Sequence, residues 1–99
     1  MTIQSYRDLQ VWRKAMVLAA DVYRLTRDMP KHEEYRLSAQ LIRAAASVPA
    51  NLAEGHGRGT RRDYAQFVSI ARGSLAEVET FLLLVSDLEL APAERCRRR

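Results

Sequence analysis

Residues 43–59 read RAAASVPANLAEGHGRG, and the way this stretch folds decides the rest of the architecture. It continues an apolar series at spacings of three and four, which predicts the buried face of an α-helix: Ser38, Leu41, Ala45, Val48 and Leu52. Pro49 lies inside this series, where it removes a backbone hydrogen bond and costs on the order of 3 kcal/mol unless the helix bends. Because the series resumes at Leu52, we expect a kink at Pro49 and not an end.

Small residues in the same helix allow a second helix to pack closely, and glycines predict where the helix ends. The side chains of residues 44–47 are small enough for a second helix to approach closely. Asn51 is expected to bond the carbonyl that the kink frees. Gly55, Gly57 and Gly59 make continued helix costly, so we predict a helix over about residues 33–57.

The chain before this helix predicts another helix over about residues 8–29, which Pro30 ends. One of its apolar seams is Leu9, Trp12, Met16, Ala19, Tyr23 and Thr26. A second seam lies beside it, at Val11, Ala15, Leu18, Val22 and Leu25. Two adjoining seams predict either a bundle of at least three helices or packing against other subunits.

The chain after the glycines predicts the longest helix, over about residues 60–89. Thr60 and Asp63 resemble a capping box with Asp in place of Glu. The expected seam is Tyr64, Phe67, Ala71, Ser74, Val78, Phe81, Val85 and Leu88. Gly73 and Ser74 are costly in the middle of an isolated helix, which suggests a close crossing with the alanine-rich helix.

These patterns predict an all-α fold, an up-and-down antiparallel bundle of three long helices. The bundle domain should cover residues 1–90, and residues 91–99 form a basic C-terminal tail. That tail holds four arginines and one glutamate, whereas residues 1–90 hold 12 basic and 11 acidic groups. Most of the net charge of +4 therefore lies in the tail. It either binds phosphate or is only solvated.

The composition also excludes several classes of protein. No apolar run is long enough to cross a bilayer, and residues 1–8 lack a signal-peptide pattern, so we expect a cytoplasmic protein. One cysteine, Cys96, cannot form an internal disulfide. Neither His32 nor His56 has a second ligand at helical spacing, and no nucleophile has a partner. We expect no enzymatic activity, no metal and no cofactor.

Four motifs resemble those of a known family. They are residues 11–15 (VWRKA), 22–26 (VYRLT), 41–55 (LIRAAASVPANLAEG) and 71–77 (ARGSLAE). In this order they resemble the four-helix-bundle proteins encoded within intervening sequences of bacterial 23S rRNA genes. The resemblance covers most of residues 9–88. Proteins of that family assemble as ring-like homopentamers, and the accessory variability proteins of diversity-generating retroelements are similar in fold.

The resemblance implies a homo-oligomer, pentameric by analogy, with a role related to RNA. The sequence departs from the family where a fourth helix would follow Leu90, so this helix is expected to be missing or vestigial. Truncation, frameshift and a natural three-helix form all remain open. In each case we expect an apolar groove along the first and third helices that favours oligomerisation.

The best candidate binding site is the segment over residues 55–62, GHGRGTRR. Arg58, Arg61 and Arg62 lie where free backbone N–H groups at a helix start favour an anion such as an RNA phosphate. Arg97, Arg98 and Arg99 are the second candidate phosphate contacts. The alternative is a glycine hinge with solvated arginines. Pro49, Asn51, Gly55, Gly73 and Ser74 are interpreted as structural.

Other residues are compatible with two roles each. The aromatic residues offer stacking surfaces for bases, although their seam positions favour burial: Trp12, Tyr23, Tyr64, Phe67 and Phe81. Arg43 and Glu54 in the second helix, with Glu77 and Glu79 in the third, form either interfacial ion pairs or exposed charges.

Two functions follow from these observations. The first is an oligomeric bundle that binds RNA without catalysis. The second is a protein-interaction adaptor or scaffold, such as an accessory protein of a reverse transcriptase. The near neutrality of residues 1–90 favours the second, and the family resemblance favours the first. No membrane partner is expected.

Overall fold

The computed structural model describes residues 5–92 and 95–96, and these form helices without any strand. The 3-10 turn η1 (Tyr6–Asp8) precedes α1 (Gln10–Arg27), and the turn η2 (Lys31–Glu33) precedes α2 (Leu37–Gly57) and α3 (Arg61–Asp87). The fold is an all-α, up-and-down antiparallel bundle, as predicted. Its extents are 44 × 22 × 19 Å. The absence or reduction of a fourth helix stays a prediction.

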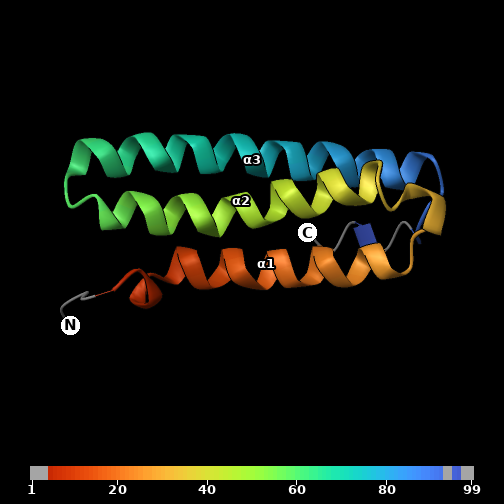
Figure 1. Cartoon of the computed structure of the whole chain (residues 1–99), viewed down its shortest axis with the longest axis horizontal. Helices are drawn as coiled ribbons and strands as arrows, with labels where there is room; N and C mark the ends of the chain where they lie inside the picture. The colour runs from red at the N-terminus through yellow and green to blue at the C-terminus, as the bar shows by residue number, and fades with distance from the viewer. Residues whose placement is uncertain (1–4, 93–94, 97–99) are drawn as a thin grey trace.

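Helix α2 lies between the other two long helices and packs against both (Figure 1). Its predicted face is confirmed, because Ser38, Leu41, Ala45, Val48 and Leu52 are all buried. Leu41 is fully enclosed and belongs to the larger core cluster, with Val22 of α1 and Val85 of α3. A smaller cluster around Leu52 fills the other end of the bundle.

Helix α2 continues without interruption through the buried Pro49. The Asn51 side-chain amide donates to the Ser47 carbonyl and to Ser47 Oγ, both at 2.8 Å. The carbonyl that loses its usual donor to a proline belongs to the residue four positions earlier, here Ala45. The expected bond from Asn51 to that freed carbonyl is therefore wrong. The kink at Pro49 remains a prediction.

Helix α1 buries three residues of the second of its two predicted seams, although Val11 of that seam is 49% exposed. Ala15, Val22 and Leu25 are buried, whereas Met16 and Tyr23 of the first seam are 45% and 53% exposed. The expected burial of Tyr23 is therefore wrong. The physical reason is that α1 finds its main neighbour, α2, on the side of the second seam, which leaves Met16 and Tyr23 at the outer edge of that contact.

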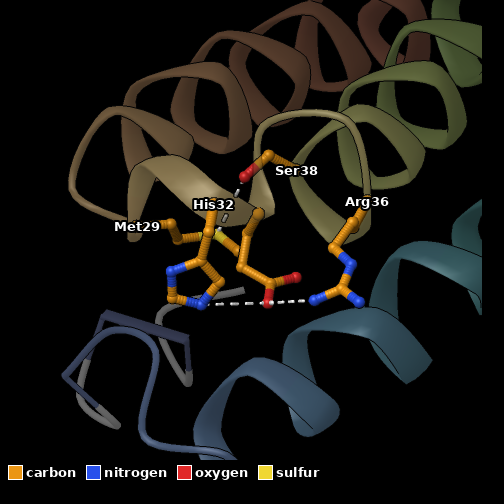
Figure 2. Close-up of polar contacts among 5 residues, drawn as sticks. Met29, His32, Arg36 and Ser38 are labelled. Atoms are coloured by element: carbon orange, nitrogen blue, oxygen red, sulfur yellow. Dashed lines mark hydrogen bonds and ion pairs between the residues drawn. The ribbon is translucent and has the colours of Figure 1, made fainter.

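The connection between α1 and α2 differs from the prediction, since α2 begins at Leu37 and not near residue 33. Arg36 has φ −114° and ψ −109°, which is not helical, and it separates η2 from α2. The Glu33 carboxylate lies 3.4 Å from His32 Nε2 and 3.9 Å from Arg36 Nη1. Ser38 Oγ donates to Met29 Sδ at 3.7 Å, so that side chains from both ends of the connection hold it together (Figure 2).

Helices α2 and α3 approach closely at two places. Ser47 Oγ and Ser74 Oγ are hydrogen-bonded at 2.8 Å near the middle of the bundle. A Cβ atom added to Gly55 would lie 2.7 Å from Phe67 Cβ, so only glycine fits there. Gly73 does not contribute to the crossing, because it is exposed and an added Cβ would meet nothing within 4 Å. The predicted role of Gly73 is therefore wrong.

The segment after α3 returns to the core. Leu90 and Ala91 pack against the larger cluster, and Cys96 is a buried member of it. Burial raises the pKa of the Cys96 thiol, although the neighbouring Arg95 lowers it to a smaller extent. Arg95 forms an ion pair with Asp28, just after α1. The core therefore extends beyond the predicted boundary at residue 90, because Ala91 packs against it and Cys96 belongs to it.

Two glycine substitutions test this packing. Gly55→Ala should lower the free energy of unfolding by about 1–3 kcal/mol, because the new methyl group overpacks the contact with Phe67. The matched change Gly73→Ala should raise it by about 0.5–1 kcal/mol, since alanine favours helix and has open space around it. Urea unfolding followed by circular dichroism measures both. Equal effects of the two changes would contradict the close approach at Gly55.

Candidate nucleic-acid interface

The connection between α2 and α3 is a short turn with defined geometry. Arg58 is the C-terminal cap of α2, and its backbone N–H donates to the carbonyls of Glu54 and Gly55. Gly59 has a φ of +81°, a conformation that side-chain-bearing residues rarely adopt. Thr60 Oγ1 then accepts the backbone N–H of Asp63 at 3.1 Å and caps α3. The sequence therefore fixes where the arginines of this turn lie.

Arg58 is engaged by its own neighbours. Its Nη2 atom lies 3.2 Å from Glu54 Oε1 in an ion pair whose side chains are both 53% exposed. Its guanidinium carbon also lies 5.2 Å from the centre of the Phe67 ring, within cation–π range. Arg58 thus joins the end of α2 to the start of α3. An RNA phosphate would have to compete with the Glu54 carboxylate for this side chain.

Arg61 and Arg62 are exposed in the first turn of α3. Within residues 5–92 and 95–96, neither side chain has an ion-pair or hydrogen-bond partner. At this helix start the Thr60 hydroxyl already accepts a hydrogen bond from the backbone N–H of Asp63. Asp63 also places a carboxylate in the same turn. An anion would therefore be held by the arginine side chains more than by the helix N-terminus.

Further basic residues lie at the same end of the bundle. Figure 1 shows η1 and the start of α1 at the end where α2 connects to α3, and η1 contacts α2. Trp12 packs in the smaller core cluster, and its ring lies edge-on to Tyr6 with centres 5.2 Å apart. Arg13 Nε donates to the Arg7 carbonyl at 2.9 Å, which ties η1 to α1. Both arginines are exposed.

Together these residues form a basic end of the molecule. We use this name for residues 6–14 and 54–63, whose basic side chains are Arg7, Arg13, Lys14, Arg58, Arg61 and Arg62. The same two ranges contain three acidic residues. The described residues around the opposite end, 21–36, 84–92 and 95, hold five basic and six acidic residues. The charge of the folded chain is therefore unevenly distributed, although residues 1–90 are nearly neutral as a whole.

Sequence reasoning missed Arg7, Arg13 and Lys14. A signal was present, because antiparallel helices bring the start of the first helix beside the end of the second. Arg97, Arg98 and Arg99, predicted as phosphate contacts, lie outside the described residues. Of the aromatic candidates, Trp12, Tyr64, Phe67 and Phe81 are partly buried.

A family model described as 23S rRNA-intervening sequence protein matches residues 7–98. The chain belongs to this family. A search of curated proteins gave no significant match. The longest motif of this rRNA-intervening sequence protein, residues 41–55, lies entirely within α2, the helix that contacts both others. Three of its polar members, Ser47, Asn51 and Glu54, make the contacts described above, so much of the motif has a structural explanation.

Two further observations concern the described residues of this family member. No group of three or more His, Cys, Asp and Glu side chains there is placed to hold a metal ion. None of the described helices is both long and apolar enough to cross a membrane.

Arg58, which contacts Phe67 and Glu54, and Arg61, which has no described partner, should differ in how much their mutation changes stability. Arg58→Ala should lower the free energy of unfolding by about 0.5–1 kcal/mol through loss of the contact with Phe67. Arg61→Ala removes an exposed side chain without a described partner and should change stability by less than about 0.5 kcal/mol. Thermal unfolding of both variants at equal salt measures the difference. A larger loss in Arg61→Ala would show that the roles are reversed.

Proposed function

We propose that this protein is a non-enzymatic helical bundle that assembles with copies of itself and binds RNA through its basic end. The observation that carries the RNA proposal is the position of Arg61 and Arg62. They are exposed and without described partners, at the end of the bundle where η1 and the start of α1 place Arg7 and Arg13 (Figure 1). Membership of a family named after the 23S rRNA intervening sequence is consistent with a role related to RNA. The proposed location is the cytoplasm.

The mechanism is electrostatic. A guanidinium matches the geometry of a phosphate and donates to it through two N–H groups. Each phosphate neutralised in this way releases condensed counterions, so the affinity must fall as salt rises. The basic side chains come from η1, α1, the C-terminal cap of α2 and the first turn of α3, which the core holds in fixed relative positions. The interface therefore reads the spacing of phosphates and not the identity of bases.

Self-association is supported by the apolar side chains that the bundle leaves exposed. Eight of them are between 42% and 67% exposed: Val11, Met16, Val17 and Tyr23 of α1, Ile70, Leu83 and Leu84 of α3, and Leu88, the C-terminal cap of α3. By analogy with the family the assembly is a ring of five. The same surface supports the second candidate function, a scaffold or a reverse-transcriptase accessory protein whose ligand is another protein.

Salt-dependent binding tests the RNA proposal. The wild-type protein should bind a labelled 23S rRNA fragment in fluorescence anisotropy, with affinity that falls steeply from 50 to 200 mM salt. Changing Arg61 and Arg62 to Ala should weaken binding and reduce the slope of log K against log salt by about 1.4–1.8, two phosphate contacts' worth. A separate variant with Arg97, Arg98 and Arg99 changed to Ala measures the contribution of the C-terminal arginines.

The matched control is the pair Arg43→Ala and Arg72→Ala, which removes the same charge from exposed positions in the middle of α2 and α3. It should change the affinity much less than the pair in the turn. Equal losses in both pairs would mean that only net charge matters, and no binding at low salt would refute the RNA proposal. Co-purification of a protein partner that survives nuclease treatment would then favour the scaffold.

A further inference from the structure

An apolar groove runs along the outer side of α1 and α2. It consists of two adjoining hollows of about 340 and 600 Å³ that share Tyr23, Arg27 and Ile42. Met16, Ala19, Ala20 and Ala46 line the first hollow, and Met29 and Pro30 line part of the second. We call this surface the α1–α2 groove. It exists because α2 leaves Met16 and Tyr23 of α1 exposed.

The charged side chains of this groove are mostly basic. Arg24, Arg27 and Lys31 line it, against Glu34 as its one acidic lining residue. Arg24 has a partner in Asp21 at 3.4 Å. Arg27 and Lys31 are exposed and have no ion-pair partner among the described residues. A ligand that fits this groove combines apolar side chains with carboxylates.

Helix α3 carries a surface of that kind. Ile70, Glu77, Phe81, Leu84 and Leu88 are spaced by seven, four, three and four positions, which places them on one side of the helix. Ile70, Leu84 and Leu88 are 45%, 42% and 57% exposed. Asp87 follows Leu84 by three positions, and no basic residue occurs between Arg72 and the end of α3. We call Ile70, Glu77, Phe81, Leu84, Asp87 and Leu88 the α3 stripe.

We propose that the α3 stripe of one copy packs into the α1–α2 groove of the next. This inference rests on the self-association in the proposed function and names its two surfaces. Apolar side chains meet apolar side chains, and Glu77 and Asp87 approach Arg27 and Lys31. The carboxylates of the α3 stripe also disfavour RNA as the partner of the stripe, because phosphates repel carboxylates.

The geometry of this contact is head to tail. Groove and stripe are different surfaces of one chain, the first built by α1 and α2 and the second by α3. Each copy therefore presents one of each, and a dimer leaves one groove and one stripe open. Contacts of this heterologous kind continue until the assembly closes into a ring or extends as a filament.

Two complementary variants test the contact. Met16→Glu with Arg27→Glu spoils the groove and leaves the stripe intact. Leu84→Glu with Leu88→Glu spoils the stripe and leaves the groove intact, because carboxylates on the stripe cannot be buried without cost. Each variant alone should sediment as a monomer of 11.3 kDa. An equimolar mixture should give a species of twice that mass, since one competent groove meets one competent stripe.

The matched control is Val17→Glu with Leu83→Glu. These residues are 61% and 67% exposed on the same two helices but line neither surface, so the control should assemble like the wild type. Far-UV circular dichroism verifies the helicity of each variant. Should a double variant lose helicity, the single changes Arg27→Glu and Leu88→Glu replace it, because both positions are exposed.

The outcomes separate this inference from the proposed function. Surface variants that assemble like the wild type, or a mixture that stays monomeric, would overturn the two surfaces while self-association stands. A wild type that is monomeric at every concentration would overturn both the surfaces and self-association. RNA binding by the basic end is measured separately and does not depend on either result.

Discussion

The structure depends on the close packing of α2 between two neighbours. Gly55 leaves no room for a side chain against Phe67, and the hydroxyls of Ser47 and Ser74 meet at 2.8 Å. Small residues along α2 let α3 approach on one side, while Leu41 and Ala45 meet α1 and α3 in a shared core. Since interiors are packed as densely as organic crystals, these side chains fix the relative position of all three helices.

This arrangement also determines which surfaces remain for function. Because α2 contacts both α1 and α3, each outer helix is covered on its side facing the core and keeps further apolar residues at the surface. The same antiparallel order brings η1 and the α2–α3 connection to one end, where basic side chains outnumber acidic ones. RNA binding and self-association are therefore proposed for different parts of the molecule, and they need not compete.

Much of this fold could be predicted from the sequence, because helical periodicity depends on local spacing. The buried face of α2 and the Thr60 cap of α3 follow directly from residue order. The choice between the two seams of α1 could not be predicted, since it depends on where α2 lies in space. For the same reason the exposure of Gly73 and the burial of Cys96 could not be predicted. Of the basic end, Arg58, Arg61 and Arg62 could be identified from the sequence, but the partner of Arg58 could not, because Phe67 approaches it only in the folded chain.

The central claim, that the basic end contacts RNA, can be tested most directly by NMR. The amide resonances of the isotope-labelled protein would be followed while a 23S rRNA fragment is added at low salt. The account predicts that the largest shifts occur at Arg7, Arg13, Gly59, Arg61 and Arg62 and disappear at high salt. Shifts confined to the α1–α2 groove or the α3 stripe would contradict it.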